Sequence, residues 1–226
     1  MSSEAAVQGG SREEVLRRIR AALGDVPRAD EEAIRAEWEA LPRGYARTGS
    51  LEHEAVLDLL EDRLRDYDAT VVRAKAGAVG AEIGRLLAER GKRRLVVPAG
   101  LVEAVGELLP EGFEFVLDAG LPAEELDGFD GVVTTSQVAI AATGTIVLQH
   151  VPGQGRRAPT LVPDYHLCVV LASDVVETVP EAMARLEGTS SLATTFISGP
   201  SATADIEMTR IKGVHGPRFL DVILVV

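Results

Sequence analysis

From residue 69 to residue 135 the sequence alternates between short apolar runs and longer runs with helical periodicity. The strand-like runs, rich in Val with some Leu, Phe and Thr, are residues 69–72, 94–97, 113–117 and 131–135. The runs between them with helical spacing of apolar residues are 79–90 and 101–109. Strands that alternate with helices pair in parallel, because each helix carries the chain back across the sheet. This stretch therefore predicts a parallel sheet covered by helices.

The rhythm changes after residue 143, where strand-like runs follow one another with little helix between them. These runs are residues 145–148, 167–171, 175–176, 193–197 and 220–226. The last is apolar apart from Asp221 and predicts a central strand buried on both faces. The whole pattern predicts a three-layer α/β fold. Its central sheet is mostly parallel with an antiparallel portion, and helices cover both faces.

The first 49 residues predict a separate helical arm, followed by an α/β domain over residues 50–226. Residues 1–10 are small and polar, which predicts disorder, and Ser11 with Glu14 forms a capping box for a first helix. A second helix is predicted from about Asp30 to Ala40. Both helices have narrow apolar stripes, so the arm packs either on a partner subunit or on its own domain. A third helix is predicted after Ser50, with Leu51, Ala55, Leu59 and Leu64 near its apolar face.

Charge and cysteine usage exclude several classes of function. The net charge of −12 disfavours binding to nucleic acid, because phosphate backbones are repelled. The single cysteine, Cys168, excludes an iron–sulfur cluster ligated by cysteines of this chain. The start of the chain shows no signal peptide, and no apolar run reaches the length of a membrane span. These features predict a soluble cytoplasmic protein without a membrane partner.

A polar loop between two apolar runs is the first candidate ligand site. It contains Gly153, Gly155, Arg156 and Arg157 and matches neither the Walker loop nor the dinucleotide fingerprint. Two arginines beside two glycines suit a carboxylate or phosphate. The loop is equally consistent with a solvated surface loop.

Hydroxyl groups and a histidine flank that loop. Thr135 and the segment Thr143, Gly144 and Thr145 are placed to bind an anion, although such residues also cap helices and form turns. His166 is interpreted as a residue that lines a site or supports the structure, rather than as a catalytic base. Cys168 is interpreted as a small buried hydrophobic residue.

Two loops near the C-terminus form the remaining candidate wall. The first carries Gly199, Ser201 and Thr203, and the second places His215 between glycines 213 and 216. His215 with Asp205 or Glu207 would make an acid–base set, although glycine and proline also simply shape loops. The four histidines are far apart in sequence and form no metal motif.

Five segments of the chain together resemble those of a known family. The segments TGTIVL, GQGRR, TLVPDYHLCVV, ISGPSATADIE and GVHGPR occur in the order typical of the lactate-utilization protein C family, or LUD domain, over roughly residues 50–226. The resemblance implies a fold like that of the ribose-phosphate isomerase, glucosamine-phosphate deaminase and CoA-transferase group. Many relatives carry an acidic residue where this chain has Ala142, and no catalytic residue is carried over.

The resemblance implies a component of a system that oxidises L-lactate to pyruvate with iron–sulfur partner proteins, which would hold the clusters. Two alternatives remain open. One is a stand-alone enzyme on a phosphorylated sugar or an acyl substrate of the CoA or folate type, and the other is a non-catalytic anion-binding or scaffold module. In each case the predicted ligand is a small carboxylate or phosphate. The predicted ligand-binding residues are Thr135, Thr143, Gly144, Thr145, Gly153, Gly155, Arg156, Arg157, His166, Gly199, Ser201, Thr203 and His215.

Overall fold

The computed structural model describes residues 4–24, 30–105, 109–203, 211–213 and 215–226. The chain divides into two compact units, of which the first ends at Tyr45 and the second begins at Ala46. Among the described residues, no helix is long and apolar enough to cross a membrane.

The first unit contains two helices, α1(Glu4–Leu23) and α2(Glu31–Ala40). Helix α1 begins seven residues before the Ser11 cap predicted from the sequence. The carboxylate of Asp30 caps α2 by accepting a hydrogen bond of 3.0 Å from the backbone N–H of Glu32. No residue of α2 is buried, and Ile34 and Trp38 are exposed. Which surface this apolar stripe contacts stays a prediction.

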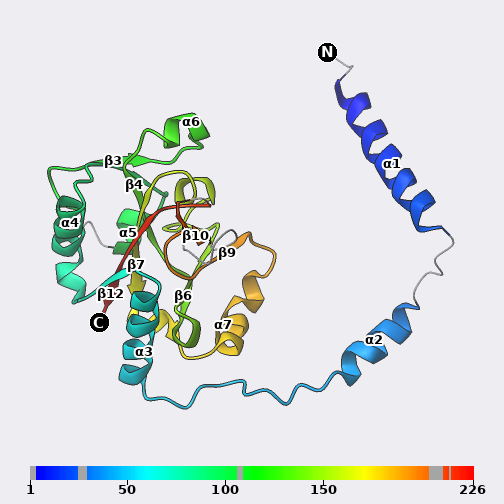
Figure 1. Cartoon of the computed structure of the whole chain (residues 1–226), viewed down its shortest axis with the longest axis horizontal. Helices are drawn as coiled ribbons and strands as arrows, with labels where there is room; N and C mark the ends of the chain where they lie inside the picture. Colours follow the sequence, from blue (N-terminus) through cyan, green and yellow to red (C-terminus); the bar gives the residue numbers. More distant parts are fainter. Residues whose placement is uncertain (1–3, 25–29, 106–108, 204–210, 214) are drawn as a thin grey trace. The chain divides into compact units, whose positions relative to one another are not determined.

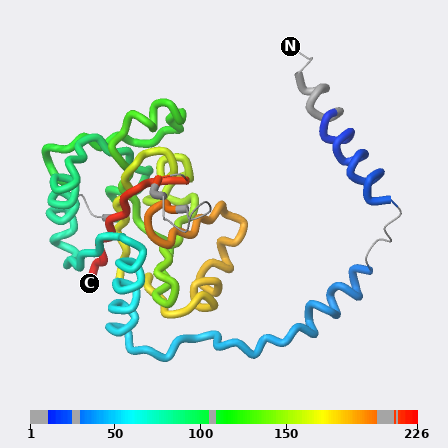
Figure 2. Tube along the Cα trace, viewed as in Figure 1, coloured from blue at the N-terminus to red at the C-terminus, as the bar shows by residue number. Residues whose placement is uncertain are grey.

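The second unit is built on a six-stranded parallel sheet with strand order β1-β12-β7-β4-β2-β3. The strands are β1(Thr70–Ala74), β2(Arg94–Val97), β3(Glu114–Leu117), β4(Gly131–Thr135), β7(Tyr165–Leu171) and β12(Phe219–Val225). The C-terminal strand β12 lies between β1 and β7 and is buried from Leu220 to Leu224, as the sequence predicted (Figure 2). Because all six strands run the same way, their amino ends meet at one end of the sheet and their carboxyl ends at the other.

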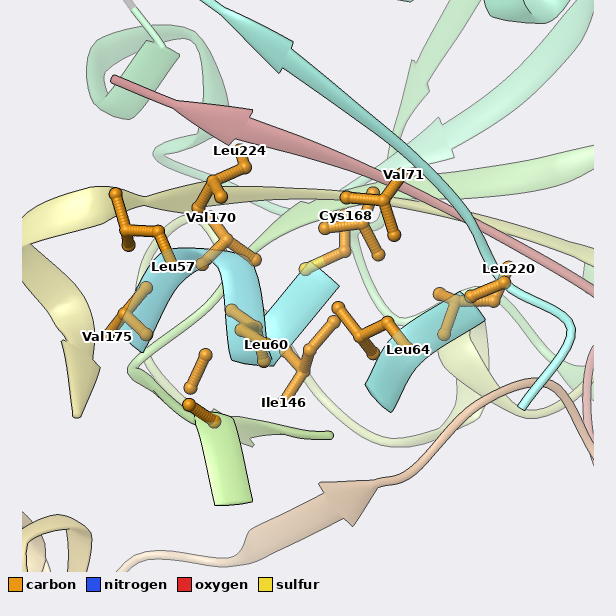
Figure 3. Close-up of a cluster of buried hydrophobic side chains, with 14 of the residues drawn as sticks. Leu57, Leu60, Leu64, Val71, Ile146, Cys168, Val170, Val175, Leu220 and Leu224 are labelled. Atoms are coloured by element: carbon orange, nitrogen blue, oxygen red, sulfur yellow. The ribbon is translucent and has the colours of Figure 1, made fainter. Parts of the chain in front are cut away.

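Different elements cover the two faces of this sheet (Figure 1). One face packs on α4(Val79–Glu89) and α5(Leu101–Val105), through a cluster that includes Ile83, Leu87 and Leu101. The other face packs on α3(His53–Asp66) through Leu57, Leu60 and Leu64, and Figure 3 shows Cys168 inside this cluster. Further along that face lies α6(Ala123–Leu126). The prediction of a mostly parallel sheet with helices on both faces is confirmed.

The antiparallel strands form a sheet of their own, with order β8-β5-β6-β9. They are β5(Val138–Ile140), β6(Thr145–Gln149), β8(Val175–Val176) and β9(Thr194–Ile197). Ile146 and Val175 reach the α3 cluster, whereas Val138 and Val147 pack on α7(Val179–Leu186). This sheet therefore lies between the α3 cluster and α7 instead of extending the central sheet. After β9 in the chain, the short strands β10(Ala202–Thr203) and β11(Ile211–Lys212) pair with each other in antiparallel fashion.

The backbone N–H groups of residues 49–51 donate to two carboxylates, Glu181 in α7 and Glu177 just before it. The N–H of Gly49 donates to Glu181 Oε1 at 3.1 Å, and those of Ser50 and Leu51 donate to Glu177 Oε2 at 2.7 Å. A Cβ on Gly49 would lie 2.1 Å from Glu177 Oε2, so this contact requires glycine. These contacts lie within the second unit, and the predicted domain boundary after residue 49 stays a prediction.

A buried polar network ties the amino ends of β7 and β12 to helix α4. The carboxylate of Asp221 has no exposed surface and accepts hydrogen bonds from Arg90 at 2.7 and 3.1 Å. The Tyr165 hydroxyl donates to the same carboxylate at 2.9 Å. Burial is the main reason that the pKa of Tyr165 is raised, and the charge of Asp221 adds to it. The Asp221 that interrupts an apolar strand therefore serves as an acceptor for two partners.

Candidate functional site

A cavity of about 270 Å³ lies at the amino end of the central sheet, and we call it the amino-end cavity. His166 and Leu220, which are paired neighbours one residue into β7 and β12, line it. The other lining residues come from the segment after the glycine-rich loop and from the two C-terminal loops. They are Arg157, Thr160, Phe196, Ile197, Ser198, Gly199, Pro200, Ser201, Ala202, His215, Gly216 and Pro217.

Arg157 supplies the positive charge of the amino-end cavity. Among the described residues, its guanidinium donates hydrogen bonds to Thr160 alone, to the carbonyl oxygen at 2.8 Å and to Oγ1 at 2.9 Å. The residue as a whole is exposed, yet its guanidinium is partly desolvated, and this burial lowers its pKa. A desolvated cation without a carboxylate partner is costly, so an anion bound beside it would be stabilised.

His166 is the buried polar side chain of this cavity, with 2% of its surface exposed. Its Nε2 and Thr134 Oγ1 share a hydrogen bond of 2.8 Å. Burial, and to a smaller extent the charge of Arg157, lower the pKa of His166 to about 3. The imidazole is therefore neutral at pH 7 and presents a hydrogen-bonding group rather than a second charge. The Asp164 carboxylate, two residues before His166 in the chain, binds Arg218 at 2.6 and 2.7 Å.

The C-terminal loops form the wall opposite Arg157, and one serine holds them together. Ser201 donates its N–H to Pro217 O at 2.8 Å, and its Oγ accepts the N–H of His215 at 3.0 Å. Gly199 has a φ of +83°, and a Cβ there would lie 2.4 Å from Tyr67 Cβ. The loop therefore requires glycine at this position. This arrangement places the exposed His215 at the cavity, with its imidazole available to a ligand.

The predicted hydroxyl residues Thr143 and Thr145 reach the cavity through Ser198. Thr145 Oγ1 lies 2.8 Å from Ser198 Oγ and 2.7 Å from Thr143 Oγ1. Ser198 lines the cavity, whereas the two threonines do not line it themselves. Gly144 has a φ of +57° and packs against Arg63, where a Cβ would lie 2.7 Å from Arg63 Cβ. Its role in the structure is to make this turn.

Four of the predicted residues lie at the other end of the sheet. Arg156 donates to Asp118 at 2.7 and 2.8 Å and to Leu121 O at 2.6 Å. Burial disfavours the charged form of Asp118, but the Arg156 guanidinium and two backbone N–H groups outweigh it and lower the pKa. Gly155 packs on Pro98, and the carbonyl of Gly153 accepts the N–H of Thr135 at 2.8 Å. Arg156 is thus engaged in a structural ion pair.

The candidate acids lie outside the described residues. This applies to Asp205 and Glu207, and the side chain of Thr203 is likewise not described. Sequence reasoning missed Thr160 and Phe196, which line the amino-end cavity. Thr160 follows Arg157 by three residues, and in a 3-10 helix such as η3(Ala158–Thr160) this spacing puts two side chains on the same face. That spacing is the signal in the sequence that could have placed Thr160 beside Arg157.

A wider hollow of about 750 Å³ between α3 and α4 carries less chemistry. It is an open surface lined by charges that already have partners. Arg73 binds Glu61 at 2.8 Å and also contacts Glu54 and Asp58. Burial opposes the charge of Arg73, but these carboxylates outweigh it and raise its pKa. We therefore interpret the hollow as a surface network. No group of three potential metal ligands comes together within the described part of the chain.

Comparison with known proteins decides the family. A model of the LUD domain matches residues 123–225. Lactate utilization protein C of Deinococcus radiodurans is 40% identical over 190 residues, which span 83% of this chain and 87% of that protein. The chain belongs to the LUD domain family. Lactate utilization protein C of Macrococcus caseolyticus is 28% identical over 193 residues, with 81% of this chain and 83% of that protein covered.

The fold is also similar to a solved structure. A crystal structure of a DUF162 family protein from Deinococcus radiodurans covers 78% of this chain and 100% of its own, with a TM-score of 0.67 and 35% identity. Every lining residue of the amino-end cavity lies within the stretch that matches the LUD domain. The cavity is thus a feature of the LUD domain itself rather than of the N-terminal helices.

Proposed function

We propose that this chain is a cytoplasmic component of a system that oxidises L-lactate to pyruvate, and that its amino-end cavity binds a small monocarboxylate. The observation that carries the proposal is the 40% identity, over most of both chains, with a protein called Lactate utilization protein C. The cavity supports it with one desolvated guanidinium, a neutral imidazole and serine hydroxyls.

The charge of the cavity favours a monocarboxylate over a phosphorylated ligand. A phosphate monoester carries close to two negative charges at pH 7. Among the described lining residues, Arg157 is the one arginine, and no lysine joins it. The neighbouring Arg156 lies at the opposite end of the sheet, paired with Asp118. A single cation matches a single carboxylate, with the serine hydroxyls left to bind the hydroxyl or keto group of lactate or pyruvate.

The oxidation itself requires partners. Converting lactate to pyruvate removes two electrons and two protons, and the electrons need an acceptor. Cys168, the single cysteine of the chain, is buried beside Thr134, and burial raises its pKa to about 12, so it suits no cluster. The proposal therefore assigns the electron carriers to iron–sulfur partner proteins. Within this chain Arg157 would bind the carboxylate, and His215 would be the exposed group near the reacting carbon.

Two measurements test the proposal. The first is lactate-dependent electron transfer in a reconstituted system with and without the full chain, and an unchanged rate without the chain would sink the assigned role. The second is binding of lactate and pyruvate by calorimetry. Arg157→Ala should weaken binding about 10- to 100-fold, because a charged hydrogen bond is lost.

Arg156→Ala is the matched control, since it removes the same charge one residue away. It should change affinity less than about twofold, because its guanidinium binds Asp118 outside the cavity. If both variants weaken binding equally, the cavity is not the carboxylate site. If neither does, the proposal of carboxylate binding fails even where the reconstituted system still needs the chain.

A further inference from the structure

A second cavity, of about 160 Å³, lies at the carboxyl end of the central sheet, and we call it the carboxyl-end cavity. The last residues of β4 and β7 line it, Thr135 and Leu171, together with Val225 at the end of β12. The start of α4 closes it from the side. In open parallel sheets, the carboxyl ends of the strands, where helices begin, are the usual place for a ligand.

Ser136 provides the observation that points to a ligand. Only 7% of Ser136 is exposed, and it lines the cavity. Its Oγ is one of two buried side-chain atoms in the described part of the chain that have no hydrogen-bond partner. A buried hydroxyl without a partner costs free energy unless something in the cavity binds it.

The turn that leads into α4 lines one side of the cavity and is already hydrogen-bonded. The 3-10 helix η1(Ala76–Ala78) leads directly into α4, and Ala76 and Val79 line the cavity. The N–H of Ala78 donates to Lys75 O at 2.8 Å, and the N–H of Val79 donates to Ala76 O. The hydroxyl of Ser136 is therefore the donor that this cavity offers to a ligand.

The charge around the carboxyl-end cavity excludes an anion. No lysine or arginine is among its described lining residues, and Asp174 is the one ionisable group there. Burial raises the pKa of Asp174, although Arg185 and Ser173 oppose this shift. In its charged form Asp174 would repel a bound anion, and its oxygens accept a hydrogen bond from a neutral donor.

The remaining lining selects for a short apolar body. Six of the nine lining residues are Ala, Val or Leu, among them Ala104 and Val169. At about 30 Å³ per water in the liquid, the volume matches a molecule of about five non-hydrogen atoms.

We propose that the carboxyl-end cavity binds a small uncharged molecule through a group that both donates and accepts hydrogen bonds, such as a primary amide or a hydroxyl. Its oxygen accepts from Ser136, and its N–H or O–H donates to Asp174. Its aliphatic part contacts Ala104 and Val169. This site is separate from the amino-end cavity and does not depend on the function proposed for it.

Propanamide and propanoate test the proposal, because they have the same shape and differ in charge. Titration of the full-length chain is followed residue by residue by ¹⁵N NMR. Propanamide should shift the amide signals of Ala76, Ser136 and Val225 in a saturable way. Propanoate should leave these signals in place and perturb residues near Arg157 instead.

Two variants complete the experiment, and thermal unfolding confirms that each is folded. Ser136→Ala should weaken propanamide about 3- to 10-fold, since one neutral hydrogen bond is lost. Ala104→Leu fills the cavity and should abolish the response. No saturable shift in the wild type means that the cavity does not bind such a molecule, and unchanged affinity in Ser136→Ala means that Ser136 does not hold it. Either result overturns the proposal. Equal shifts with propanoate overturn the assignment to an uncharged ligand.

Discussion

The two ends of the central sheet carry cavities of opposite character, although the same strand, β7, contributes to both. At the amino end His166 and Arg157 surround the cavity, whereas at the carboxyl end Val169 and Asp174 do. One end therefore favours a carboxylate and the other favours an uncharged group. The difference shows that each charged group comes from a segment outside the central strands, Arg157 at the amino end and Asp174 at the carboxyl end, whereas β7 contributes the neutral His166 to one cavity and Val169 to the other.

Two consecutive arginines make the same point at a smaller scale. Arg156 points to Asp118 at the carboxyl end of the sheet, and Arg157 reaches the amino-end cavity. The chain passes from one end of the sheet to the other between Val151 and Tyr165, and the two arginines lie within this passage. Residues with the same chemistry and adjacent numbers thus have separate tasks.

The largest expected effect comes from breaking the network that supports the amino end. Asp221→Ala should lower the free energy of unfolding by about 3–5 kcal/mol, because it leaves Arg90 and the buried Tyr165 hydroxyl without their acceptor. Urea unfolding measures this loss. Asp221→Asn is the control, since it keeps an acceptor for Tyr165 and should cost less. A loss below about 1 kcal/mol for the alanine variant would contradict the proposed anchoring role.

His166 should make the stability of the amino end depend on pH. Its pKa falls from 6.5 to about 3 on folding, so the unfolded chain binds a proton more readily. The stabilisation is complete above pH 6.5 and is lost as the pH falls towards 3. Between pH 7 and pH 5 the wild type should therefore lose about 2 kcal/mol more than His166→Gln. Equal pH dependence of the two proteins in urea unfolding would show that the imidazole is not held neutral.

The two arginines should differ in their effect on stability as well as on binding. Arg156→Ala leaves the Asp118 carboxylate, with 5% of its side chain exposed, supported only by backbone N–H groups. This variant should lower the free energy of unfolding by about 1 kcal/mol. Arg157→Ala should cost less or stabilise the unliganded chain, because it removes a desolvated charge that no described carboxylate pairs with. Thermal unfolding compares them, and a larger loss in Arg157→Ala would reverse this assignment.

Much of the fold could be predicted from the sequence, because strand and helix periodicity are local. The strands at residues 94–97 and 131–135 have the predicted bounds, and β12 is the predicted buried strand. The apolar face of α3 was predicted only in part. Leu64 is buried and Leu59 packs on the core as predicted, but Leu51 and Ala55 are exposed. Leu51 precedes the helix, whose N-cap is Glu52, and the other buried residues are Val56, Leu57 and Leu60. The prediction placed the N-cap of α3 at Ser50, two residues before Glu52, and this error shifted the predicted positions of the buried residues.

The candidate site was predictable as a set of loops but not as a set of side chains. The pattern selected Arg157, His166, Gly199, Ser201 and His215, and the structure brings these five to one cavity. It places Thr135, Gly153 and Gly155 at the other end of the sheet. The sequence contains no signal for this division, because the direction of a side chain in an irregular loop depends on distant hydrogen bonds.

The sequence by itself determined the elements, the parallel sheet and the group of loops that carry polar residues, since all three follow from residue types at short range. The tertiary structure alone decided which arginine is paired and which is exposed to a ligand. It also left Ser136, which follows Thr134 and Thr135 in a run of hydroxyl residues, as a buried hydroxyl with no partner in the described part of the chain. The physical reason is that pairing and burial depend on what the rest of the chain places within a few ångströms of each group.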